Sequence, residues 1–103
     1  MFGLSASDIA RLIQVISSYP DVEEAIVFGS RAMGNYKPCS DVDIALKGNL
    51  KPQTADNIAI ELNERIPLPY KFDVVAYPSL SNRPLSDHID QYGKTLFKRV
   101  YPT

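Results

Sequence analysis

Two aspartates, Asp41 and Asp43, stand one residue apart in a segment that has the pattern of a strand. In an extended chain, residues two apart point to the same face, so both carboxylates project together while Val42 points to the other face. Carboxylates that close repel each other and raise each other's pKa unless a cation lies between them. Mg²⁺ takes oxygen ligands and is usually held by one or two carboxylates together with substrate phosphates. The pair therefore predicts a site for Mg²⁺, with Mn²⁺ as an alternative ion.

A break in the sequence pattern, Gly29-Ser30-Arg31, follows the apolar run Ala25 to Phe28. The run is typical of a buried strand, and the glycine and serine interrupt it where a helix could begin. Gly29 lets a ligand approach the backbone, Ser30 can donate to a phosphate or cap the helix, and N–H groups at a helix start attract anions. Arg31 adds a positive fork that suits phosphate oxygens. We expect these three residues to bind a nucleotide.

Together the two motifs resemble the signature of the nucleotidyltransferase superfamily that includes the polymerase β palm. That signature is an apolar residue, Gly-Ser or Gly-Gly, a short spacer, and Asp-apolar-Asp. The chain is similar in particular to the minimal nucleotidyltransferases of prokaryotes, through Phe28-Gly29-Ser30-Arg31-Ala32-Met33-Gly34 and Ser40-Asp41-Val42-Asp43-Ile44-Ala45. The resemblance spans most of the chain. It also implies a third carboxylate on a later strand, where Asp73 stands in Lys71-Phe72-Asp73-Val74-Val75.

The resemblance implies a reaction in which a nucleoside monophosphate, AMP above all, moves from an NTP such as ATP to an acceptor hydroxyl. Asp41 and Asp43 are then expected to hold one Mg²⁺, and these two acids with Asp73 to share a second. Asp73 is also the candidate for accepting the hydroxyl proton. Ser30 and Arg31 are expected to hold the β- and γ-phosphates.

A partner protein is also implied by the resemblance. Similar chains often act as the MntA-type antitoxin of a toxin–antitoxin pair, in which a small helical toxin of the HEPN family receives AMP on a tyrosine. The two proteins would then form a hetero-oligomer. Two alternatives stay open: a vestigial nucleotide-binding antitoxin that neutralises its partner by occlusion, and a small-molecule nucleotidyltransferase, which normally has an added acceptor domain.

Composition narrows the class of protein. The chain has 103 residues, of which 45% are hydrophobic and 22% charged, so we expect a single domain over residues 1–103. A net charge of -1 argues against a broad nucleic-acid surface. No apolar run predicts a membrane span and no signal-peptide pattern opens the chain. The single Cys39 cannot form an internal disulfide, so a cytoplasmic location with a reduced thiol is expected.

The periodicity of apolar residues predicts an α/β fold of the α+β type, with a small mixed sheet and helices mainly on one face. Helical segments are expected over residues 7–18, within 32–37, over 53–65 and around 85–92. Strands are expected over residues 24–28, 41–46 and 71–76, and 95–101 is either an edge strand or a frayed helix. In the third strand, Asp73 and Val75 should lie on the face opposite to Phe72 and Val74.

His88 is the only histidine of the chain, and it stands in the expected helix around residues 85–92 between Asp87 and Asp90. We expect a solvated side chain here and not a general base. Three basic residues of the C-terminal segment are expected to be solvated as well: Lys94, Lys98 and Arg99.

Overall fold

The computed structural model describes residues 1–101; residues 102 and 103, which the predicted domain includes, lie outside the described part. Helices and strands alternate along the chain. The elements in order are α1 (Ala6–Ser17), β1 (Glu24–Phe28), α2 (Ser30–Met33), β2 (Val42–Lys47), α3 (Thr54–Ile60), the π-helical turn η1 (Glu61–Arg65), β3 (Phe72–Ala76), the 3-10 turn η2 (Tyr77–Ser79), α4 (Arg83–Tyr92) and β4 (Lys94–Lys98).

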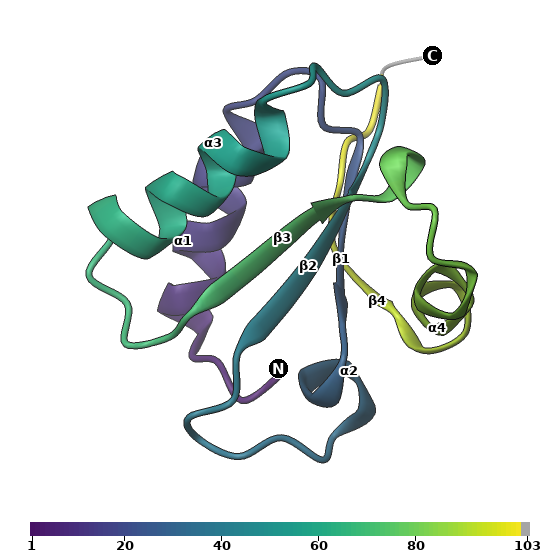
Figure 1. Ribbon diagram of the computed structural model, residues 1–103. Helices are drawn as coiled ribbons and strands as arrows, with labels where there is room; N and C mark the ends of the chain where they lie inside the picture. The colour runs from purple at the N-terminus through teal and green to yellow at the C-terminus, as the bar shows by residue number, and fades with distance from the viewer. Residues whose placement is uncertain (102–103) are drawn as a thin grey trace.

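The strands form one mixed sheet in the order β3-β2-β1-β4. β1 is antiparallel to both β2 and β4, whereas β2 and β3 are parallel. The parallel pair is connected through α3, as a parallel crossover requires. Helices α1 and α3 lie on one face of the sheet and α4 lies on the other (Figure 1). The predicted mixed sheet with most of its helices on one face is confirmed, and the alternative for the last segment resolves as an edge strand, β4.

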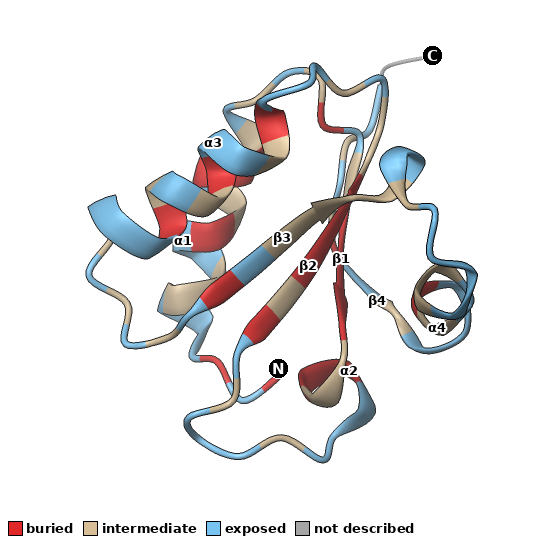
Figure 2. Ribbon diagram, in the orientation of Figure 1, coloured by how far each residue is buried: buried red, intermediate tan, exposed pale blue. Residues whose placement is uncertain are grey.

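The main core lies between the sheet and the α1/α3 pair. Alternation along the strands sends one set of apolar side chains to this face, where they meet the apolar stripes of both helices. Figure 2 shows the buried residues concentrated on β1, β2 and the inner sides of α1 and α3. The largest fully buried side chains of this core are Leu12, Ile16, Val22, Val27, Val42, Ile44, Leu46, Ile58 and Leu62.

The opposite face of the sheet has a smaller apolar cluster. It is built from Ile26 and Phe28 of β1, Ala45 of β2 and Ile89 of α4. Half-buried side chains pack against these four: Val75, Tyr77, Leu80 and Leu85. Helix α4 therefore covers only part of this face.

Two local devices set the helices in place. The Ser5 hydroxyl accepts a hydrogen bond from the Asp8 amide at 3.1 Å and so caps α1. The predicted helix over residues 53–65 is divided, because the α-helical pattern ends at Ile60 and continues as the π turn η1. Within η1, the Asn63 side chain donates to the Phe72 carbonyl at 2.9 Å and accepts from the Phe72 amide at 2.8 Å. Asn63 thereby anchors the start of β3.

Across residues 1–101, no helix combines the length and the apolar character needed to cross a membrane.

Candidate active site

Of the three acids singled out in the sequence, Asp43 and Asp73 lie on two neighbouring strands, β2 and β3. In the parallel pairing of β2 with β3, Asp43 is the register partner of Asp73. Asp41 immediately precedes β2 and is exposed, as is Asp73, whereas Asp43 is half-buried. Between the two acids of the first pair, Val42 is fully buried on the other face. Strand alternation and register thus direct Asp43 and Asp73 to the face that α4 partly covers.

The carboxylates of this group influence each other. Burial raises the pKa of Asp43 above its usual value, and the negative charges of Asp73 and Asp41 raise it further. The nearby His88 acts in the opposite direction and lowers the pKa of Asp43. Three carboxylates therefore share one electrostatic field, and a cation placed among them would relieve their repulsion.

Gly29 brings the backbone directly against one of these acids. It has φ 71° and ψ -153°, a conformation that favours glycine, and a Cβ atom at this position would overlap the Asp43 carboxylate. Helix α2 starts at the next residue, so Gly29 and not Ser30 occupies the N-cap position. The half-buried Ser30 has no hydrogen-bond partner for its hydroxyl in the described part of the chain. The turn and Asp43 therefore form one continuous surface.

His88 was missed by the sequence analysis, and the expectation of a solvated side chain is wrong. Its Nε2 atom accepts a hydrogen bond from the Gly29 amide at 3.0 Å. The ring also lies edge-on to Phe28, with 6.2 Å between ring centroids, and 5.4 Å from the Tyr92 ring. A signal was present, because His88 follows Leu85 by three residues and precedes Tyr92 by four, which places it beside the apolar stripe of α4.

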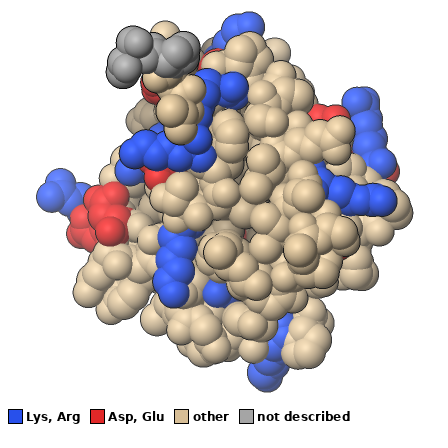
Figure 3. All heavy atoms as spheres, turned by 180° about the vertical axis from the view of Figure 1, so that it is seen from behind, with Lys and Arg blue, Asp and Glu red and all other residues tan. Residues whose placement is uncertain are grey.

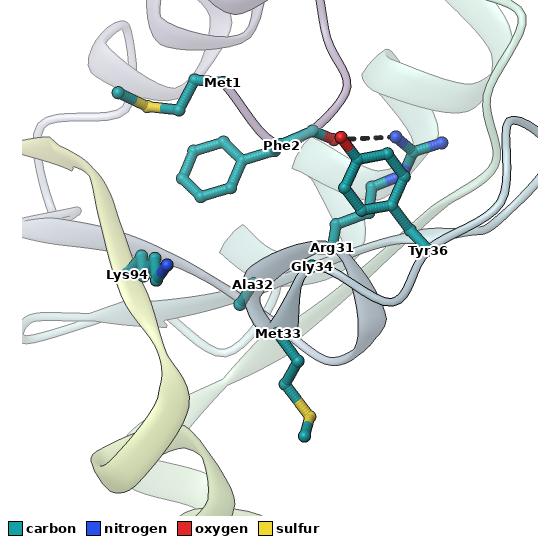
Figure 4. A pocket seen from close by; sticks show the side chains of 8 residues that line it. All are labelled: Met1, Phe2, Arg31, Ala32, Met33, Gly34, Tyr36 and Lys94. Atoms are coloured by element: carbon teal, nitrogen blue, oxygen red, sulfur yellow. Dashed lines mark hydrogen bonds between the residues drawn. The ribbon is translucent and has the colours of Figure 1, made fainter.

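Arg31 does not have the phosphate-binding position that was predicted. Its side chain is 2% exposed. Nη1 donates to the Phe2 carbonyl at 2.8 Å, Nε and Nη2 donate to the Ser40 carbonyl at 3.1 and 2.9 Å, and Nη2 also donates to Pro38. The guanidinium carbon lies 5.1 Å from a ring centroid on Tyr36, which Figure 4 shows beside it, and the same distance from a second tyrosine ring.

The inward position of Arg31 follows from its place in α2, which is a single turn of four residues, Ser30–Met33. Its second and third residues, Arg31 and Ala32, face the interior, and Gly34 ends the turn in the left-handed conformation. Arg31 therefore ties the N-terminal segment to the loop that leads into Asp41. In this structure it supports the site from behind and is not free to grip a phosphate.

A cavity of about 390 Å³ lies beside α2 (Figure 4). None of the three acids lines it. Its walls come from the N-terminal segment, α2, the following loop and the start of β4: Met1, Phe2, Arg31, Ala32, Met33, Gly34, Tyr36 and Lys94. The acids and the Gly29 turn thus form a separate, open site on the surface.

The donor set suits a hard divalent cation, since carboxylate oxygens are the ligands that Mg²⁺ prefers. Burial and the negative charges of Asp73 and Asp41 raise the pKa of Asp43, and a cation at this place would offset both effects. Nevertheless, within residues 1–101 no three side chains of the His, Cys, Asp or Glu type already converge as a metal cage. The acids fit a cation that substrate phosphates help to hold, more than one enclosed by protein ligands alone.

Comparison with known proteins agrees with this geometry. A toxin–antitoxin complex solved with AMP-PNP has a chain that superposes with TM-score 0.74 at 24% identity, over 89% of this chain and 74% of that one. A tri-AMPylated HEPN toxin of Shewanella oneidensis in complex with its MNT antitoxin matches with TM-score 0.64 at 24% identity, over 96% and 74%. The toxin–antitoxin MntA–HepT matches with TM-score 0.68 at 21% identity, over 92% and 74%. These likenesses establish a common fold.

No curated protein matches the chain significantly. The sequence model of the family described as "Polymerase beta, Nucleotidyltransferase" matches residues 10–101, which includes the Gly29 turn and all three acids. The chain therefore belongs to the polymerase β family of nucleotidyltransferases.

Proposed function

We propose that this protein transfers AMP from ATP to a tyrosine hydroxyl of a HEPN-type partner, and thereby acts as the antitoxin of a toxin–antitoxin pair. The observation that carries the proposal is the placement of Asp43 between the Gly29 turn and Asp73, with Asp41 close enough to affect its pKa. Such an arrangement offers acidic ligands and a glycine turn on one open surface. Catalysis of this type depends mainly on positioning and electrostatics, which a small surface site can supply.

In the proposed reaction, the acceptor oxygen forms a bond to the α-phosphorus of ATP. The bond between that phosphorus and the oxygen bridging to the β-phosphate breaks, and pyrophosphate leaves with the electron pair. Asp73, which is exposed, accepts the hydroxyl proton. Ser30, the first residue of α2, is proposed to donate its hydroxyl to a phosphate, whereas Arg31 is assigned to the support of the loop before Asp41.

Asp41, Asp43 and Asp73 are the residues proposed to hold two Mg²⁺ ions, or Mn²⁺ in their place. When bound, divalent ions neutralise phosphate charge and favour the ionised acceptor. The protein's own part is to hold the carboxylates near one another. Strand register pairs Asp43 with Asp73, and buried Val42 fixes the chain between Asp41 and Asp43.

The choice of a protein acceptor draws on the solved neighbours and on the surface of this chain. Among the neighbours are a complex with AMP-PNP and a complex with a tri-AMPylated HEPN toxin. On the face seen in Figure 3, lysine and arginine side chains lie in separate groups divided by uncharged surface. A nucleic-acid acceptor would call for a continuous basic surface. We further place the reaction in the cytoplasm, in keeping with the exposed free thiol of Cys39.

The test uses ATP labelled at the α-phosphate, Mg²⁺ and a HEPN-type protein from the same genome. We expect the partner to gain labelled AMP on tyrosine and to lose its toxicity. Asp41→Ala and Asp43→Ala should each reduce labelling at least ~100-fold, because each removes charge stabilisation at the reacting phosphate. Asp56→Ala is the matched control, since Asp56 is exposed on α3 away from the three acids.

Two results would overturn the proposal. If the Asp41→Ala, Asp43→Ala double variant neutralises the partner as well as the wild-type chain without added mass, the partner is silenced by occlusion. If label reaches only small hydroxyl compounds and never the partner, the protein is a small-molecule nucleotidyltransferase.

A further inference from the structure

We propose that His88 is a positioning residue of this active site, which fixes the Gly29 turn against Asp43 by accepting the hydrogen bond of the Gly29 amide. The inference concerns the same site as the proposed transfer reaction, and its kinetic test rests on that function. A separate measurement, given below, does not.

The contacts form a short series from α4 to the acids. His88 Nε2 lies 3.0 Å from the Gly29 nitrogen. The next atom of the turn, the Gly29 Cα, faces the Asp43 carboxylate so closely that no side chain would fit between them. Asp43 in turn is the register partner of Asp73. A displacement of the turn would therefore be transmitted directly to the central acid of the site.

Gly29 needs such a tether more than an ordinary residue would. Glycine has the widest range of backbone conformations, and φ 71° is only one of the regions open to it. The following helix, α2, is four residues long and gives little stiffness to its own start. A hydrogen bond from a distant element supplies the restraint that the local sequence lacks.

The His88 ring is itself well held. Phe28 contacts it edge-on, Tyr92 packs at an angle on it, and the adjacent Ile89 is 2% exposed in the apolar cluster beneath α4. Nε2 is the ring atom that accepts the bond from the Gly29 amide. The packed His88 ring thus holds its Nε2 atom toward the amide of Gly29, the residue directly before α2.

The alternative role for His88 is simple packing of α4 on β1. Two substitutions separate the roles. His88→Phe retains an aromatic ring against Phe28 and Tyr92 but has no acceptor atom. His88→Gln loses the ring but places an amide oxygen near the position of Nε2, so it can accept the same bond.

In the transfer assay, His88→Phe should have a kcat about threefold to tenfold below that of the wild-type chain, which is the effect of one lost hydrogen bond. Its KM for ATP should stay within about twofold of the wild-type value. His88→Gln should recover most of the lost kcat. Wild-type kcat in His88→Phe, no recovery in His88→Gln, or a change confined to KM would each overturn the inference.

Amide hydrogen exchange measured by NMR tests the contact without any reaction. The Gly29 amide should exchange slowly in the wild-type chain, about tenfold faster in His88→Phe, and slowly again in His88→Gln. The Gly93 amide, which donates to Ile89 at 2.9 Å at the end of α4, is the internal control and should not change. Equal acceleration of both amides would mean that α4 has loosened, and would overturn the inference.

The two tests also distinguish failure of the inference from failure of the proposed function. If the wild-type chain transfers no AMP, the proposed function fails, and the exchange rates alone decide whether His88 holds the turn. If the wild-type chain is active and His88→Phe matches it in both measurements, only the inference fails.

Discussion

The two faces of the sheet differ in what covers them. On the α1/α3 face, Val27, Ile44 and Leu46 are completely buried against two helices. On the other face, α4 covers only part of the sheet, and the apolar residues Ile26 and Ala45 lie in that covered part. Beyond it, the alternation of side chains along the strands places the carboxylates of Asp43 and Asp73 on the same face. One face is a closed core, and the other changes from core to reactive surface within a single strand.

This difference shows how one strand can serve stability and chemistry together. In β2, Val42 faces the closed core and Asp43 faces the open site, although the two residues are adjacent. A strand separates neighbouring side chains to opposite faces without any cost to its backbone hydrogen bonds. Asp43 is therefore anchored by a strand of the core, while its carboxylate faces the open site.

The largest expected effect on stability comes from placing a charged side chain on the closed face of β2. Val42→Asp places an unpaired carboxylate in the closed core, and such a charge costs a large part of the ~5–15 kcal/mol that stabilises a protein of this size. We expect loss of cooperative unfolding by circular dichroism. Asp43→Ala, one residue further along β2, should unfold cooperatively near the wild-type temperature. A well-folded Val42→Asp protein would show that the two faces are not distinct in this way.

The next largest effect is expected at Arg31, whose buried side chain supports the loop that leads into the open site. Arg31→Met removes a buried guanidinium that donates to three carbonyl groups, and we expect a loss of about 2–4 kcal/mol in the free energy of unfolding. Urea denaturation measures it. The control is Arg83→Met, because the Arg83 side chain is 88% exposed and its ion pair with Asp87 should contribute little. Equal stability of both variants would return Arg31 to the role of a ligand-binding side chain.

The smallest effect is a gain in stability at the open site. The pKa of Asp43 is raised in the folded chain above the ordinary value of 3.8, so the folded state holds this proton more tightly than the unfolded state does. Asp43 therefore reduces stability once the pH rises through its folded-state pKa. Without metal, Asp43→Asn should melt a few degrees higher than wild type at pH 7.

The same variant should lose this advantage below about pH 3.8, where Asp43 is protonated in both states. Differential scanning calorimetry at pH 7 and pH 3, with a chelator present, makes the comparison. A destabilised Asp43→Asn protein at pH 7 would mean that the carboxylate is held by attractive contacts and not crowded by its neighbours.

Periodicity was sufficient to predict most of the helices and strands, because they follow from backbone geometry that the sequence states directly. The shared face of Asp41 and Asp43 stays a prediction, since Asp41 lies just before β2. The strand pairing that places Asp73 beside Asp43 came only from resemblance, since no local signal encodes register between strands distant in sequence. Arg31 was misassigned because the direction of a side chain on a one-turn helix depends on what surrounds it. Its residue type suits a phosphate and a cluster of carbonyls equally well.

His88 illustrates the same limit from the other side. Its flanking acids, Asp87 and Asp90, suggested a solvated position, and local charge is a weak guide where a helix packs across a strand. The hydrogen bond to Gly29 joins residues 59 positions apart. Only the packing of α4 on β1 creates that contact, and no local pattern in a single sequence predicts how two such elements pack.

The hydrogen bonds between Asn63 and Phe72 affect whether another extended chain can pair with the β3 edge of the sheet. β3 is at the edge of the sheet, and an edge strand offers its free amide and carbonyl groups to any passing extended chain. The amide and the carbonyl of Phe72 are already hydrogen-bonded to the Asn63 side chain, which takes the place of a neighbouring strand there. An extended chain added to this edge of the sheet would therefore find no free backbone groups at Phe72, the residue before Asp73.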